Sequence, residues 1–256
     1  ARMNHYNKLF SVAIVAAISV LASVSALADV EMIHGKAVNA DGELLFLEEH
    51  TIKYQDNRIA SIKTVYYDTN SKKIGQTLTD FSHGAQVGSY EFKDERMQYY
   101  DGAKIMADQI LIYSKETPEA DTQKKYLDRE PSQIVGQGFH SFILANLDAL
   151  ARGDVIAAKL VLPAQMDQFD IRIRKSQFED GRLTIQIELD NWFLRLFAPR
   201  IEAEYNLEAR RLLKYKGVSM IADASGKNVP VTVSYAYSQQ NLQVSSLMTP
   251  EAVRQD

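Results

Sequence analysis

Hydrophobic and polar residues alternate with a period of two along several short stretches of this chain. Residues 169–174 read Phe-Asp-Ile-Arg-Ile-Arg and residues 183–189 read Leu-Thr-Ile-Gln-Ile-Glu-Leu, and residues 201–205 and 231–237 repeat the pattern. Successive side chains of a strand point to opposite faces, so this alternation indicates sheets with one buried and one solvated face. Sheets of that kind are typically antiparallel.

Apolar runs separated by polar turns fill the first half of the chain. Polar stretches at residues 55–57 and 68–71 favour hairpin turns, and Asp101-Gly102 and Glu179-Asp180-Gly181 have the composition of tight turns. We therefore expect strands over residues 43–54, 59–67, 74–81, 89–92 and 103–113.

One stretch has the spacing of a helix instead. Residues 138–151 read GFHSFILANLDALA, and their large apolar side chains recur every three or four positions. Glycines at 136 and 138 are suited to the start of this helix, and Arg152-Gly153 is a typical helix end. Because the helix lies between two β-rich blocks, we expect it to plug or cover the sheet and to shield its edges.

The domain organisation follows from these elements. Residues 115–133 are polar and contain two prolines, so we expect a long exposed connection there. Since the later strands are needed to cover the earlier ones, we expect a single β-rich domain over residues 29–238 and a flexible tail at residues 239–256. The predicted fold class is mainly β with a minor helical part: a curved antiparallel sheet, or open half-barrel, with one principal covering helix.

Residues 3–28 have the organisation of a secretory signal peptide. Lys8 lies in a short polar start, residues 9–24 are apolar and uncharged, and Ala26-Leu27-Ala28 fits the site that signal peptidase cleaves. An uncleaved anchor is the alternative, but an apolar stretch of about 16 residues falls short of the roughly 20 needed to span a bilayer. We expect a signal-peptide helix that is cleaved after Ala28, with residues 1–2 as upstream carry-over.

The amino-acid composition limits the cell compartments and the classes of partner that we expect for this protein. The chain has no cysteine, which excludes disulfides, thiolate metal sites and lipidation at a bacterial lipobox. Its net charge of −4, without a basic block, argues against nucleic acid as a partner. We expect a periplasmic protein, with extracellular release as the alternative. No pattern in the sequence specifies an oligomeric state.

Histidine–carboxylate pairs are the candidates for catalysis. On a strand, Glu48 and His50 share one face about 7 Å apart. They are either two metal ligands, a base with its orienting carboxylate, or part of a solvated strand face. His140, near the start of the helix, is the second candidate, with Asp148 as its carboxylate; the alternative is a half-buried histidine of the core. The chain has no zinc-binding spacing and no nucleophile elbow, and we expect no metal and no cofactor.

Residues 190–199 break the alternation and hold the only tryptophan among several apolar residues. They either fill the concave face of the sheet or form an exposed apolar lip that touches a membrane or an apolar ligand. Arg172 and Arg174 share a strand face and either meet anionic lipid headgroups or are balanced by Glu188 on a solvated face. The candidate ligand-lining residues are Phe139, Phe142, Ile143, Trp192, Phe193 and Phe197.

The order of elements is similar to that of a known group of proteins. Strands, a covering helix and further long strands follow a signal peptide, with local phrases at residues 67–75, 90–96 and 211–217. In these features the chain resembles uncharacterised secreted bacterial proteins with the open-barrel fold of the Lol-system lipoprotein carriers (LolA and LolB). The resemblance implies a half-barrel with a hydrophobic concave face and a helical lid.

Three functions remain open from the sequence. The first is a periplasmic binding or envelope-maintenance protein that holds a lipid-like or acyl group in an apolar concavity, with peripheral membrane contact. The second is a secreted hydrolase that uses a histidine–carboxylate pair. The third is a structural or protein-interaction module, which requires a filled interior and an exposed sheet edge or apolar patch.

Overall fold

The computed structural model describes residues 29–191, Arg195 and residues 200–240. The predicted signal peptide and the predicted tail after Gln240 lie outside the described part of the chain. The same holds for three of the candidate ligand-lining residues, Trp192, Phe193 and Phe197. Within that part the chain is mainly β, as the sequence predicts, with one α-helix and one short 3-10 helix.

The first half of the chain forms eight strands. They are β1 (Val30–Val38), β2 (Leu44–Gln55), β3 (Arg58–Tyr67), β4 (Lys73–Asp80), β5 (Ser89–Asp94), β6 (Tyr99–Ile105), β7 (Gln109–Lys115) and β8 (Gln123–Asp128). The second half contains seven strands and the two helices. They are β9 (Gln133–Val135), α1 (Gly138–Arg152), β10 (Ile156–Leu162), η1 (Pro163–Gln165), β11 (Asp167–Glu179), β12 (Arg182–Leu189), β13 (Ile201–Asn206), β14 (Arg211–Ala222) and β15 (Asn228–Gln240).

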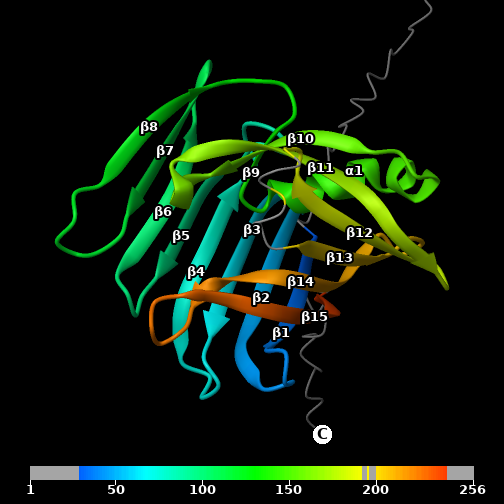
Figure 1. Cartoon of the computed structure of the whole chain (residues 1–256), viewed down its shortest axis with the longest axis horizontal. Coiled ribbons are helices and arrows are strands. Elements are labelled where there is room, and N and C mark those ends of the chain that lie inside the picture. Colours follow the sequence, from blue (N-terminus) through cyan, green and yellow to red (C-terminus); the bar gives the residue numbers. More distant parts are fainter. Residues whose placement is uncertain (1–28, 192–194, 196–199, 241–256) are drawn as a thin grey trace, which may run out of the picture.

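All fifteen strands belong to one curved sheet that does not close. Its order runs from β8 down to β1, then to β15 and down to β9. Neighbouring strands are therefore consecutive in the chain, with the single exception of the pair β1 and β15. Neighbours are antiparallel apart from β9 and β10, which α1 connects as a parallel pair. In Figure 1 the strands of the second half run across those of the first. The sheet therefore folds over on itself, and β8 and β9 remain as its two edges.

Two tight turns confirm the hairpin predictions. Asp56 and Asn57 have φ values of 50° and 58° and connect β2 to β3, and Asp180 and Gly181, with φ of 49° and 72°, connect β11 to β12. Positive φ at both central residues is the geometry of turns whose twist matches that of the flanking strands, and Asp, Asn and Gly tolerate it best.

Asp101-Gly102, predicted as a turn, lies inside β6. The chain turns after β6 instead, where the Met106 amide donates to the Gln109 carbonyl. Glycine at position 102 has a packing reason: a Cβ there would lie 2.4 Å from the Tyr113 hydroxyl. Gly102 therefore marks a close approach between β6 and β7 and not a change of chain direction, so the predicted turn is wrong.

Residues 115–133, predicted as a long exposed connection, contain the strand β8 and the first residue of β9. Five of the six residues of β8 are exposed, so this edge strand lacks the apolar alternation by which a half-buried strand is recognised. β9 is short and entirely buried, so it also lacks alternation.

The helix α1 confirms the prediction for residues 138–151. Its last turn ends at Gly153, whose φ of 103° and backbone N–H bond to Leu150 cap the helix in the left-handed conformation. Its apolar stripe packs into a cluster with β10 to β13, so the helix covers the second half of the sheet. The helical residues buried in this cluster are Phe142, Ile143, Leu147 and Leu150.

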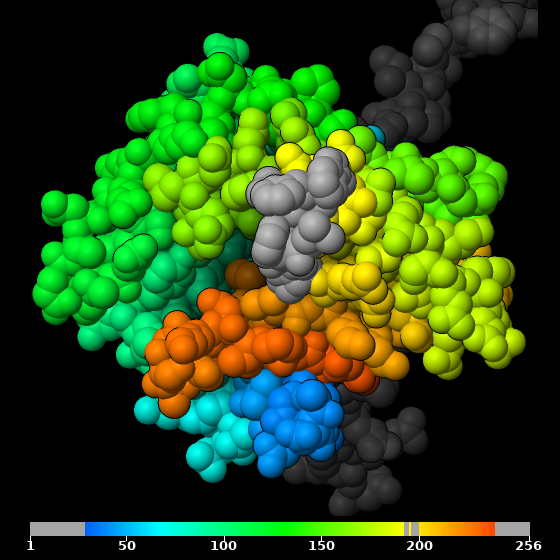
Figure 2. All heavy atoms as spheres, viewed as in Figure 1, coloured from blue at the N-terminus to red at the C-terminus, as the bar shows by residue number. Residues whose placement is uncertain are grey.

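A second cluster packs the two halves of the sheet against each other. It joins Phe46, Tyr66 and Phe92 of the first half to Val231 and Val233 of the second. A hollow opens beside this contact in Figure 2, between β10 and the β14–β15 hairpin, with strands of the first half at its floor. The chain as described contains no helix that is long and apolar enough to cross a membrane.

Candidate functional site

Two adjoining cavities lie inside the folded-over sheet. The larger has a volume of about 330 Å³ and the smaller about 210 Å³. The two cavities share part of their lining, which we call the shared wall. It consists of side chains from β2, the start of α1, β12, β14 and β15. The shared residues are His50, Gln137, Phe139, Ile187, Tyr215 and Tyr235.

Most of the cavity wall is aliphatic or aromatic. Phe46, Leu160 and Val231 line the larger cavity, whereas Ile33 and Ile52 line the smaller one. Tyrosine contributes an apolar ring with a polar tip and suits such a wall. The tyrosines that line one or both cavities are Tyr66, Tyr90, Tyr205, Tyr215, Tyr235 and Tyr237.

A chain of hydrogen bonds crosses the shared wall and ends on a carboxylate. The Thr79 hydroxyl donates to Gln137 Oε1 (3.0 Å), and Gln137 Nε2 donates to Thr64 Oγ1 (2.6 Å). Thr64 Oγ1 lies 2.7 Å from His50 Nδ1, and His50 Nε2 lies 2.8 Å from Glu48 Oε2. Since the Thr64 oxygen already accepts from Gln137, its proton is available to Nδ1, and the His50 proton then sits on Nε2 and faces Glu48.

Gln137 is a member of this site that the sequence analysis missed. It lies at the N-cap of α1 between two glycines. A Cβ at Gly136, which has a φ of +52°, would lie 2.3 Å from the Tyr90 ring, and one at Gly138 would lie 2.2 Å from the Gln86 carbonyl. The glycines therefore let the start of the helix press against β5 and the loop before it, which carries the Gln137 side chain to β3 and β4. The Gly-Gln-Gly spacing was the available sign.

His140 also faces the smaller cavity, where its ring stacks on Tyr205 with centroids 6.0 Å apart. His140 Nδ1 lies 3.4 Å from the Tyr205 hydroxyl. Burial, together with the nearby His50, lowers the pKa of His140 to about 4. The imidazole is therefore neutral at pH 7.

The structure separates the predicted site residues. Phe139 lines both cavities, but Phe142 and Ile143 lie in the cluster beneath α1, because the face of the helix that bears them is the one packed on β10 to β13. Asp148 is exposed and pairs with Arg210 at 3.3 Å, away from both histidines. Glu48 and His50, in contrast, are brought together at the cavity wall.

Of the two readings for Arg172 and Arg174, the structure favours the balanced sheet face. Glu188 Oε1 lies 2.6 Å from Arg172 and 3.2 Å from Arg174, and Arg195 lies 3.6 Å from the same oxygen. The described residues include no group of three or more His, Asp or Glu side chains that could hold a metal ion.

Comparison with known proteins identifies no family for this chain. No protein-family model matches the chain, and no curated protein matches it. Among solved structures, the crystal structure of a beta-barrel-like protein of the domain of unknown function DUF1849 from Brucella abortus matches with a TM-score of 0.39 and 8% identity, over 84% of this chain and 99% of that one. The fold and the cavities define this chain as a β-rich, barrel-like protein with a hollow, mainly apolar interior.

Proposed function

We propose that the protein is exported and acts in the cell envelope as a binding protein that holds a lipid-like or acyl group inside the sheet. The observation that carries this proposal is the pair of adjoining interior cavities with a mainly apolar wall. Their volumes of about 330 Å³ and 210 Å³ together fall in the range of pockets that enclose small ligands.

Burial of an alkyl chain would supply the binding energy. Each methylene removed from water contributes about 0.8 kcal/mol, so affinity should depend mainly on chain length. The hydrogen-bonded chain from Thr79 to Glu48 adds polar groups at one place on the wall, which is typical of sites that orient an otherwise apolar ligand.

Native mass spectrometry of protein purified from its own cells tests the proposal. The expected result is an added mass that organic extraction removes and that lipid analysis assigns to an acyl or alkyl compound. Protein that is recovered empty, and that takes up no alkyl compound in solution, would contradict the proposal.

A hydrolase is the second candidate, favoured by the Glu48–His50 pair at the cavity wall. The pair has a carboxylate that orients an imidazole, but Glu48 and Thr64 occupy both ring nitrogens. Thr64 is fully buried, so a substrate would have to displace it before the imidazole could act as a base. Ester hydrolysis that disappears in His50→Gln would support an enzyme, whereas an unchanged background rate would leave the binding role.

A further inference from the structure

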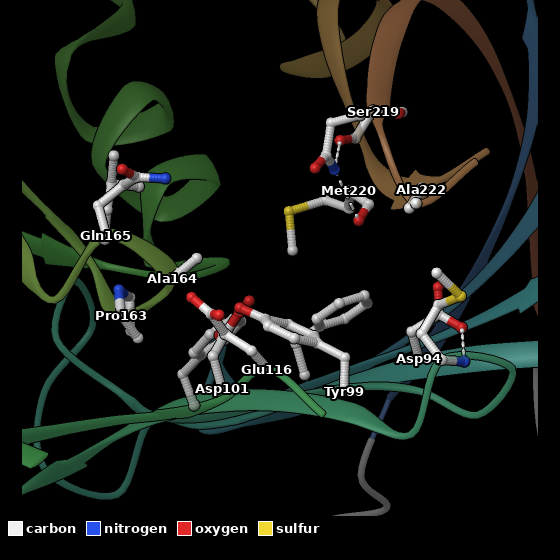
Figure 3. Close-up of a pocket in the computed structure, with 16 residues that line it drawn as sticks. Asp94, Tyr99, Asp101, Glu116, Pro163, Ala164, Gln165, Ser219, Met220 and Ala222 are labelled. Atoms are coloured by element: carbon white, nitrogen blue, oxygen red, sulfur yellow. Dashed lines mark hydrogen bonds between the residues drawn. The ribbon is translucent and has the colours of Figure 1, made fainter. Parts of the chain in front are cut away.

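A third cavity, of about 360 Å³, lies next to the larger interior cavity. Its floor is formed by β5, β6 and Glu116, which directly follows β7; one side is formed by η1 and the other by the end of β14 (Figure 3). Along β14 the ladder to β15 breaks between Val218 and Ala222, so Ser219 and Met220 turn toward this space. Bulges of this kind often re-aim side chains beside functional sites.

This outer cavity adjoins the larger interior cavity. Tyr90, Leu162, Pro163, Ser219 and Met220 line both of them. An amphiphile could therefore place its tail among the apolar residues of the interior and its polar head in the outer cavity.

Asp101 is the most unusual group in the outer cavity. Its side chain is on β6 and only 3% exposed. The Tyr99 hydroxyl donates to its Oδ2 at 2.6 Å, while its Oδ1 is buried and makes no hydrogen bond to any described residue. A buried carboxylate oxygen without a partner is costly, and Asp101 belongs to the lining of a cavity whose occupant could supply the missing donor.

The other charged groups of this cavity do not neutralise Asp101. Glu116 on the same floor adds a second carboxylate, as Figure 3 shows. Asp94 is already paired with Arg96 at 2.7 Å. No lysine, arginine or histidine is among the described residues that line the cavity.

We propose that the outer cavity binds the cationic head of an amphiphile, with an ammonium group donating to Asp101 Oδ1 and facing Glu116. The alkyl tail then passes Tyr90 and Pro163 into the larger interior cavity. This inference rests on the proposed function, because it takes the interior as the place of the tail. It excludes anionic amphiphiles, whose heads would meet two unneutralised carboxylates.

Calorimetric titration with three eight-carbon compounds tests the inference: octylammonium, 1-octanol and octanoate, each below its micelle concentration at pH 7.5. Octylammonium should bind tightest and octanoate weakest. Asp101→Asn should weaken octylammonium by roughly tenfold to a hundredfold, the range of a buried charged hydrogen bond, and leave 1-octanol nearly unchanged.

Two further variants test whether a loss of binding in Asp101→Asn comes from the head site and not from a general effect of replacing a carboxylate in this sheet. Glu116→Gln, at an exposed position, should weaken octylammonium by up to about fivefold. Glu91→Gln, on β5 and paired with Lys93 outside the cavity, should have no effect. Binding of octylammonium in the unaltered protein should also weaken below pH 6, and Asp101→Asn should lose this pH dependence.

The two proposals fail in different ways. If octylammonium and 1-octanol bind equally and Asp101→Asn changes neither affinity, the cationic head site is wrong and the apolar interior stands. If none of the three compounds binds, both the head site and the proposed function are contradicted.

Discussion

At the scale of the residue, two buried groups couple protonation to folding with opposite signs. The pKa of His140 is lowered to about 4 by burial and by the nearby His50, whereas that of Asp101 is raised to about 6 by burial, against the opposing effect of the hydrogen bond from Tyr99. In both cases the folded protein favours the neutral form of the group. The free energy of unfolding is therefore larger when His140 is neutral, at high pH, and larger when Asp101 is neutral, at low pH.

His140 should make the protein less stable in mild acid. The unfolded chain binds the His140 proton near pH 6.5 and the folded chain only near pH 4, so stability is lost as the pH falls through this window. Between pH 7 and pH 5 the loss amounts to about 2 kcal/mol. In His140→Phe, which keeps a ring against Tyr205, urea denaturation should show a loss smaller by about this amount. An equal loss in both proteins would contradict the assignment.

Asp101 should act in the other direction. Its contribution is complete below pH 3.8 and is lost as the pH rises to about 6, a difference of about 3 kcal/mol. Asp101→Asn keeps an acceptor for Tyr99 and removes the charge, so urea denaturation at pH 7.5 should find this variant more stable than the unaltered protein. Glu91→Gln serves as the control and should leave the stability within about 0.5 kcal/mol. A less stable Asp101→Asn would mean that the charged carboxylate is stabilised beyond its hydrogen bond from Tyr99, and would contradict an unpartnered Oδ1.

At the scale of the element, the sequence predicts what has a local cause. The stripe of α1 and the turns at residues 55–57 and 179–181 depend on residues close in the chain, and all are confirmed. The strand β8 was missed because an exposed edge strand carries no buried face to mark its period. The turn at Asp101-Gly102 was misplaced because the partner of that glycine, Tyr113, belongs to the next strand.

Docking of α1 on β10 to β13 should be a main source of stability in the second half of the sheet. Leu147 is fully buried there, and truncation of such a leucine costs about 2–5 kcal/mol through lost burial and the cavity left behind. Leu147→Ala should lower the free energy of unfolding in urea by this amount. Leu78→Ala, at a position that is 47% exposed, should cost under about 1 kcal/mol. Similar losses in the two variants would contradict the packing described for the helix.

At the scale of the whole molecule, the cavities arise from the way the sheet folds over. The shared wall combines His50 on β2, Ile187 on β12 and Tyr235 on β15, which only the β1–β15 pairing and the curvature of the sheet bring together. The sequence analysis found Glu48, His50 and Phe139 from local pattern. The glycines at 136 and 138 mark the close packing around Gln137 but not its partners, and no local pattern marks the outer cavity around Asp101, because both depend on contacts between distant parts of the chain.

The most direct test of the binding role is calorimetric titration with a series of neutral n-alkanols from six to ten carbons. If the interior takes up the chain, affinity should rise about fourfold per methylene. Ile201→Trp, which narrows the larger cavity, should reduce binding of the longer members, while Leu78→Trp on the exposed face should not. Affinity that is independent of chain length, or unchanged in Ile201→Trp, would contradict a ligand-holding interior.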